Sequence, residues 1–476
     1  MKLHAHADLR LIQRRILKLG SLRKGRSWTI IAAIAIEFVI YTSAIGADVT
    51  STWNVANGNW GIAGNWNPNT NFPNNGTLTY DAVLGNNGTI TLDQNITIQK
   101  YTQSNGTLGG TGNFTLTLNE LMTWSGGTVG GNGILVANGG ITLSGAGTKQ
   151  LGNGANTGRT LINNGTTTLS GGDTADLLIS TSGGGNPGSM FTNNGTFNVT
   201  DDADIVFNSL GGSPSSFANT TTGVFNKSGT GTTTQIIVAS SNSGVVNVNS
   251  GTLNYAGQFT QTAGSLNLLG GSISGILPLN IQGGTVTGNG TITGSVVNSG
   301  GTIAPGVGSG AISISGDLSL GNSSTLSIEI GGLAQGTQYD FLSEAGSFAL
   351  TLDGTLTLSF INGFQGSVSP TDTFTVFTSN QVLLGAFDNV ANGARLNLAN
   401  APGSFQVNYG AGSPFGAPNV VLSAFVIPEP SAAVLVALGF ASLVLRRRVP
   451  RDYSGPAVDG SFNPSGVNSR SVKLTS

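Results

Sequence analysis

A short motif of glycine, then serine or threonine, then an aliphatic residue returns about every twenty residues, and this spacing restricts the folds open to the chain. Its copies begin in one set at Gly251, Gly271 and Gly290, and in a second set at Gly264, Gly284 and Gly301. The steps are 20 and 19 residues in the first set, and 20 and 17 in the second. A repeat of this length with two or three short strands suits a parallel β-helix, where each coil buries its aliphatic side chains against the next.

Strand patterns surround these motifs. Segments such as Leu318-Ser319-Leu320 and 356–360 alternate apolar with small polar residues, which places one face of a strand inward. Between Ala47 and Phe425 no long stretch has apolar residues at helical spacing. We therefore predict an all-β fold, a right-handed parallel β-helix over 73–330, with a Trp-rich cap at 48–72 and a small β region at 331–426. The repeat is less regular between 150 and 240, so irregular coils or an inserted loop are expected there.

The composition fits stacking and excludes several chemistries. Charged residues make up 8% of the chain, because stacked like charges repel along a ladder whereas Asn, Thr and Ser side chains can hydrogen-bond. Cys is absent and the two histidines, His4 and His6, lie in a basic leader. The body therefore lacks the residues for a thiolate nucleophile, a Ser-His-Asp triad or a His-ligated metal. The near-neutral net charge also argues against a nucleic-acid partner.

Both ends of the chain carry targeting patterns. Residues 1–47 combine a basic segment, an apolar run and the small residues Ala44, Gly46 and Ala47, which predicts a secretory signal read by the secretion translocon. An uncleaved anchor is the alternative. Near the other end, residues 427–448 hold a Pro-Glu-Pro triplet, an apolar run and an arginine cluster: Pro428, Glu429, Pro430, Arg446, Arg447 and Arg448. The apolar run is short for a permanent transmembrane helix but sufficient for a transient membrane stop.

These three ordered elements resemble the PEP-CTERM sorting signal of Gram-negative and related bacteria. The resemblance implies processing by an exosortase, a membrane cysteine peptidase, and delivery toward the cell surface or matrix. This chain departs from that family by continuing past the arginines with a polar basic tail, 449–476. Separately, the order of motifs from Gly301 to Asp388, with no membrane barrel after them, resembles the last passenger segment of autotransporter-like β-helix proteins over about ninety residues.

Two residue groups are candidate sites. The tryptophans Trp53, Trp60 and Trp66 would form either a hydrophobic cap over the first coil or a platform for glycan contact, and we favour the cap because solenoid ends need covering. The body's densest acidic group, Asp201, Asp202 and Asp204, is the place to seek a calcium site or the carboxylates of an enzyme. Lysines and arginines are scattered, which disfavours a lyase, and a solvated turn is the default interpretation.

The leading hypothesis is a non-enzymatic, exported structural or adhesive protein of the bacterial cell surface or extracellular biofilm matrix, without a required cofactor. A carbohydrate-active β-helix enzyme, either a polysaccharide lyase or a glycosidase, is the alternative. An ice-binding solenoid is a minor one, because the threonine runs keep no regular register. Residues 47–430 carry a net charge of −12. An acidic body of this kind predicts Ca²⁺-dependent association with anionic matrix, with exopolysaccharide as a partner.

Overall fold

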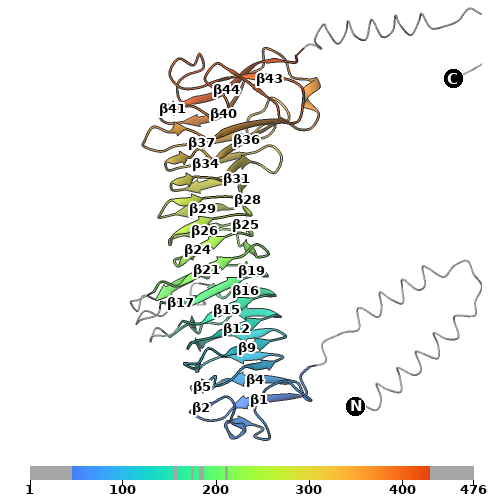
Figure 1. The fold of residues 1–476 in the computed structure, drawn as a ribbon, viewed down its shortest axis with the longest axis vertical. Helices are drawn as coiled ribbons and strands as arrows, with labels where there is room; N and C mark the ends of the chain where they lie inside the picture. Colours follow the sequence, from blue (N-terminus) through green and yellow to red (C-terminus); the bar gives the residue numbers. More distant parts are fainter. Residues whose placement is uncertain (1–45, 154–157, 173–175, 182–186, 209–212, 429–476) are drawn as a thin grey trace, which may run out of the picture. The chain divides into compact units, whose positions relative to one another are not determined.

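In the computed structural model of the chain, residues 46–153, 158–172, 176–181, 187–208 and 213–428 are described. The chain winds into a stack of coils (Figure 1), and its strands form three parallel sheets, which we call A, B and C. From Ile96 to Glu344 successive strands lie in sheets C, A and B, in that order. The coil from 134 to 151 is typical, with β12 (Ile134–Ala137) in sheet C, β13 (Gly140–Leu143) in sheet A and β14 (Lys149–Leu151) in sheet B. The expected parallel β-helix is therefore confirmed.

Sheet A holds one strand from each coil, and its members are β1 (Val49–Trp53), β4 (Tyr80–Leu84), β7 (Tyr101–Gln103), β10 (Met122–Trp124), β13, β16 (Thr166–Leu169), β19 (Thr196–Val199), β22 (Val224–Lys227), β25 (Val245–Val248), β28 (Ser265–Leu269), β31 (Thr285–Thr293), β33 (Thr302–Pro305), β36 (Thr325–Ile330) and β39 (Thr355–Phe360).

Sheet B is built in the same way from β2 (Asn57–Asn59), β5 (Thr89–Thr91), β8 (Thr107–Gly109), β11 (Gly127–Val129), β14, β17 (Leu177–Ser180), β20 (Ile205–Asn208), β23 (Thr233–Ile236), β26 (Thr252–Tyr255), β29 (Ser272–Gly275), the second half of β31, β34 (Ala311–Ile314), β37 (Phe341–Glu344) and β40 (Phe374–Ser379).

Sheet C is shorter and comprises β6 (Ile96–Ile98), β9 (Thr115–Leu118), β12, β15 (Thr160–Asn163), β18 (Met190–Asn193), β21 (Ser216–Asn219), β24 (Ala239–Asn242), β27 (Phe259–Gln261), β30 (Leu279–Ile281), β32 (Val296–Asn298) and β35 (Leu318–Leu320).

The register of sheet A gives the length of each coil directly. Val246 pairs with Leu266, and Leu266 pairs with Val286, which are steps of 20 residues. The coils in the middle of the stack are longer, because Thr167 pairs with Phe197 across 30 residues. The extra residues lie in the corners between strands, so four-residue strands keep their pairing while the corners absorb the insertions. The irregularity expected between 150 and 240 is therefore present.

The stack continues across residue 330 and is then closed by antiparallel strands. β36 pairs with β39 in sheet A, and β37 pairs with β40 in sheet B. The outer side of β40 is covered by an antiparallel strand, β44 (Asn419–Val426). The remaining short elements are β3 (Trp66–Asn67), β38 (Thr351–Leu352), β41 (Leu384–Gly385), β42 (Arg395–Asn397), β43 (Ser404–Asn408) and the 3₁₀ turns Ala63–Asn65 and Phe364–Gly366. An antiparallel strand ends the ladder because it satisfies the last exposed sheet edge.

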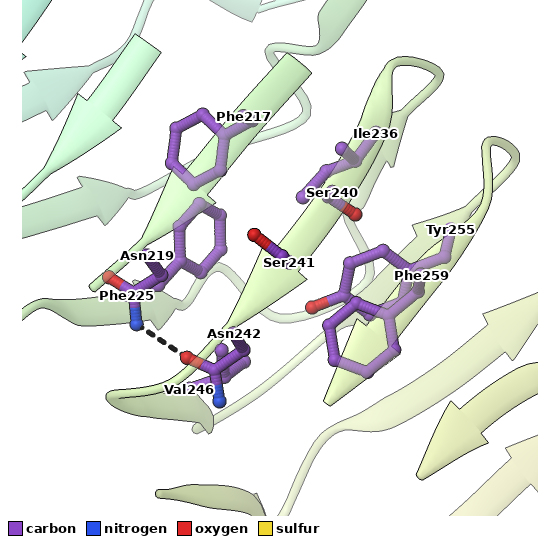
Figure 2. Close-up of a pocket in the computed structure, with 10 residues that line it drawn as sticks. All are labelled: Phe217, Asn219, Phe225, Ile236, Ser240, Ser241, Asn242, Val246, Tyr255 and Phe259. Atoms are coloured by element: carbon purple, nitrogen blue, oxygen red, sulfur yellow. Dashed lines mark hydrogen bonds between the residues drawn. The ribbon is translucent and has the colours of Figure 1, made fainter. Parts of the chain in front are cut away.

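The interior is filled by the alternate side chains of all three sheets. Between coils, Phe191 stacks on Phe217 and Phe197 stacks on Phe225, each pair with ring centroids 5.4 Å apart. Such rings bury large apolar areas and favour these offset geometries. Where Phe217, Phe225 and Tyr255 meet, a cavity of about 10 Å³ remains (Figure 2). This volume is near the minimum for one water, so the core is close to fully packed.

A row of buried amides runs through the same interior beside sheet C. Nδ2 of Asn163 donates to Oδ1 of Asn193 at 2.7 Å, and Asn193 donates in turn to Asn219 at 2.8 Å. Asn219 donates to Asn242 at 2.7 Å, as Figure 2 shows, and Asn242 donates to Gln261 at 2.7 Å. We call these five residues the inner amide ladder. Each asparagine also donates to backbone carbonyls of its own corner or the next, so the Nδ2 groups of the four ladder asparagines are paired inside the core.

Candidate functional site

The three candidate tryptophans lie together at the first coil. Trp53 and Trp66 are 5.0 Å apart between ring centroids, and Trp60 and Trp66 are 4.8 Å apart. The indole N–H of Trp60 donates to the Pro73 carbonyl, and that of Trp66 donates to the Trp60 carbonyl, both at 2.8 Å. At most 2% of each side chain is exposed. The rings therefore offer no face on which a sugar could stack, and their geometry is that of a cap over the open end of the core.

The acidic group at 201–204 folds into turn contacts. The Asp201 carboxylate accepts hydrogen bonds from the backbone N–H groups of Gly171, Gly172 and Ala203, at 2.7, 3.2 and 3.1 Å. Asp204 accepts one from the N–H of Gln235 at 2.6 Å. These two carboxylates therefore connect neighbouring coils.

The same acidic group faces a buried cation. Nζ of Lys227 donates to the Asp201 carbonyl, the Ser228 carbonyl and the Thr232 hydroxyl, at 2.5 to 2.8 Å. Burial lowers the pKa of Lys227, and the negative charges of Asp201, Asp202 and Asp204 oppose that shift. Within the described part of the chain, no three or more His, Cys, Asp or Glu side chains are arranged to hold a metal. The arrangement supports a structural role for the trio, which compensates Lys227.

A second polar row runs along the outer face of sheet A. Asn226 donates to Asn198 at 2.9 Å, Asn247 donates to Asn226 at 2.9 Å, and Asn267 donates to Asn247 at 2.7 Å. We call these four half-buried residues the outer amide ladder. Its amides are partly open to solvent, unlike those of the inner ladder. The row presents hydrogen-bond donors and acceptors at the spacing of successive strands.

The outer amide ladder leads into a surface groove of about 480 Å³. In sheet A, Asn267 pairs with Thr287 and Thr287 with Ala304, and these three residues form part of the groove floor. Val307, with 76% of its side chain exposed, lines it, and Glu329 lies at the far end. The groove combines amide, hydroxyl, apolar and carboxylate groups. Such a surface suits a hydroxyl-rich ligand.

Asp340 lies beside Glu329 and is almost fully buried. Its two carboxylate oxygens accept hydrogen bonds from the backbone N–H groups of Gly310, at 2.9 Å, and Glu329, at 2.7 Å. Burial raises the pKa of Asp340 to about 7, and the charge of Glu329 adds to the rise, although the two hydrogen bonds oppose it. Asp340 therefore fixes the backbone that carries Glu329, and Glu329 is the acidic group that ligands in the groove can reach.

Sequence reasoning did not single out this groove. Glu329 and Asp340 stand in the motifs that resemble an autotransporter passenger, but no chemical role follows from them there. The outer amide ladder could have been predicted from the sequence, since Asn226, Asn247 and Asn267 follow one another at intervals of 21 and 20 residues. That interval matches the coil length of the regular region.

The predicted sorting segment is described only at its first residues, where Pro428 is exposed. Glu429, Pro430 and the arginines Arg446 to Arg448 lie outside the described residues, as do residues 1–45 of the predicted signal and the predicted apolar helices at both ends. In the portion of the chain with described structure, no helix has the length and hydrophobicity needed to cross a membrane.

The fold defines the class of the molecule as a parallel β-helix with an inner and an outer amide ladder. Comparisons with protein-family models, curated proteins and solved structures gave no match. The function is therefore argued from the chain's own geometry.

Proposed function

We propose that the chain is an exported structural and adhesive protein of a bacterial cell surface or extracellular matrix. The observation that carries the proposal is the outer amide ladder, which continues into a polar groove on one face of a rigid stack. A stack stabilised by contacts between neighbouring coils gives an extended, repetitive surface. Such a surface suits many weak contacts with a polymer better than one tight contact with a small molecule.

The proposed partner is exopolysaccharide, bound through hydroxyl groups along the outer amide ladder. Sedimentation of the full chain with insoluble polysaccharide tests this. Replacing Asn226, Asn247 and Asn267 together by alanine should reduce the bound fraction severalfold. The matched control replaces three residues on the other sheets that are half-buried like those of the ladder, Gln150, Asn254 and Asn280, and should bind as the wild type does. Equal binding by both triple variants would refute adhesion through this face.

Export and sorting are proposed from the end segments, with the translocon and an exosortase as partners. The test replaces Pro428, Glu429 and Pro430 by alanine in a chain tagged within the body. The variant should remain full-length in the membrane fraction while the wild-type body appears shortened at the surface or in the matrix. Unchanged size and location would show that the segment is not a processing signal.

Calcium enters this proposal as a bridge between the acidic body and anionic matrix. Binding to anionic polysaccharide should fall when a chelator is added and return with excess Ca²⁺, while binding to neutral polysaccharide should not respond. Chelator-insensitive binding to both polymers would contradict the bridge.

A carbohydrate-active enzyme is the second candidate function, and the groove with Glu329 is the observation that favours it. Asp201, Asp202 and Asp204 are poorer candidates, because the carboxylates of Asp201 and Asp204 accept backbone hydrogen bonds at turns. Turnover of neutral and acidic polysaccharides, with and without Ca²⁺, should be measured for the wild type and for Glu329→Gln. Cleavage that the variant abolishes would replace the structural proposal with an enzymatic one.

A further inference from the structure

Among the residues that the structure describes, three cations are buried at corners of the stack, and two of them are fully paired. Nζ of Lys149 donates to the carbonyls of Ser144, Gly145 and Gly147, the last two at 2.9 Å. Lys227 has three acceptors of its own, described above. Three oxygen acceptors match the three N–H groups of an ammonium ion. The corners of this fold therefore supply acceptors for buried cations.

The third cation, Arg159, is paired at one nitrogen only. Its side chain has no exposed surface, and its Nε donates to the Gly130 carbonyl at 2.5 Å. Both terminal nitrogens, Nη1 and Nη2, are buried with no hydrogen-bond partner. Burial lowers the pKa of Arg159 to about 10, which still leaves the guanidinium charged at neutral pH. An unpaired buried charge costs several kcal/mol in proteins, so a partner is expected.

The next coil offers a second unpaired group at the same corner. Thr160 pairs with Met190, so Ser189 stacks directly on Arg159, and the N–H of Met190 donates to the Arg159 carbonyl at 3.1 Å. The Ser189 hydroxyl is buried and has no hydrogen-bond partner. It points over Gly152, where a Cβ atom would lie only 1.9 Å from it. A glycine is therefore required below this hydroxyl, because the Ser189 side chain occupies the position that a Cβ atom of residue 152 would take.

We propose that Arg159 and Ser189 hold one small inorganic anion inside the stack. The guanidinium would supply the charge and up to four N–H donors from Nη1 and Nη2, and the hydroxyl would supply a donor from the next coil. An anion there pairs the charge, because no carboxylate of the described residues lies in hydrogen-bonding contact with Arg159. Its chemistry is that of chloride or of an oxyanion such as phosphate, and two arms of one experiment separate these sources. Because it bridges adjacent coils, the anion would join them.

Thermal unfolding of the full chain at constant ionic strength tests the site, with chloride or inorganic phosphate exchanged for a bulky organic anion. Above the dissociation constant, each tenfold rise in the free anion concentration should raise the midpoint by about 2 °C for a body of this size. Arg159→Met should lose the response and, without the anion, should be at least as stable as the wild type. Ser189→Ala should weaken the response. Lys227→Met, the matched control, should lower the midpoint yet keep the response.

A response to chloride alone or to phosphate alone identifies the anion and supports the site. A wild type that responds to neither, or an Arg159→Met variant that responds as the wild type does, overturns it. A direct readout guards against variants that do not fold: crystals of the wild type grown in bromide should show an anomalous peak within hydrogen-bonding reach of Arg159 Nη1 or Nη2. A well-ordered Arg159 with no bromide beside it, and with no phosphate beside it in crystals grown in phosphate, would also refute the proposal.

Discussion

Removing one member of the inner amide ladder should destabilise the stack far more than removing one member of the outer ladder. Nδ2 of Asn219 contacts Oδ1 of Asn242 at 2.7 Å and the carbonyls of Gly223 and Val245 at 3.1 Å, and its Oδ1 accepts from Asn193 at 2.8 Å. Its two hydrogens serve three acceptors, so the group makes about three full hydrogen bonds. At about 1 kcal/mol each, Asn219→Ala should cost on the order of 3 kcal/mol.

Asn226→Ala is the matched control, since Asn226 also has an amide above and below it, each at 2.9 Å. It is half-buried, water can replace the lost partners, and the cost should stay below about 1 kcal/mol. Because a solenoid opens locally, native-state hydrogen exchange is the suitable assay. Amides of β21 and β24 should exchange roughly 100-fold faster in Asn219→Ala, and those of β22 less than tenfold faster in Asn226→Ala. Equal acceleration in the two variants would refute the reasoning from burial.

Three further predictions follow from single sites. Asp340 has a folded pKa of about 7, above its usual 3.8, so its contribution to stability is complete below pH 4 and is lost as pH rises through 7. The midpoint of thermal unfolding should therefore fall from pH 5 to pH 8, and Asp340→Asn should flatten that fall. Gly284→Ala should lower the free energy of unfolding in urea by more than about 2 kcal/mol, because φ is +71° and a Cβ would lie 2.4 Å from the Gly264 carbonyl oxygen. The control Gly231→Ala has a similar φ of +77° but open space around the Cβ, and it should cost about 1 kcal/mol. Trp60→Ala should cost about 3 to 5 kcal/mol by the same assay and leave polysaccharide binding by the folded chain unchanged, because its ring is buried in the cap.

The register of the regular coils could be read from the sequence. Leu253 pairs with Ile273, and Ile273 with Ile292, which reproduces the steps of 20 and 19 in the first glycine motif set. The second set fits equally well, because Leu266 pairs with Val286 and Val286 with Ile303. The motif is informative because it joins a turn requirement to an inward-facing aliphatic, and both recur once in each coil.

The longer coils could be predicted only as irregular. Sheet A steps by 26 residues from Ile141 to Thr167 and by 28 from Phe197 to Phe225. Added corner residues do not change which strand residues face inward, so they leave no trace in the alternating pattern. A period search detects that the repeat fails there, whereas locating each insertion requires the strand pairing itself.

The candidate sites were harder to predict because the same residue type serves opposite environments. In the pair Asn163-Asn164, the first side chain lies in the inner amide ladder, whereas the second is exposed and donates to Asn138 at 2.8 Å. Likewise, a cluster of aspartates in sequence suggested calcium, although Asp201 and Asp204 use their oxygens on backbone N–H groups. Asparagine and aspartate side chains hydrogen-bond to backbone groups at a coil corner as readily as they bind a ligand. Polar residues in such a solenoid therefore point to function only where the fold leaves them open to solvent, as in the outer amide ladder and its groove, or leaves them buried without a partner, as at Arg159.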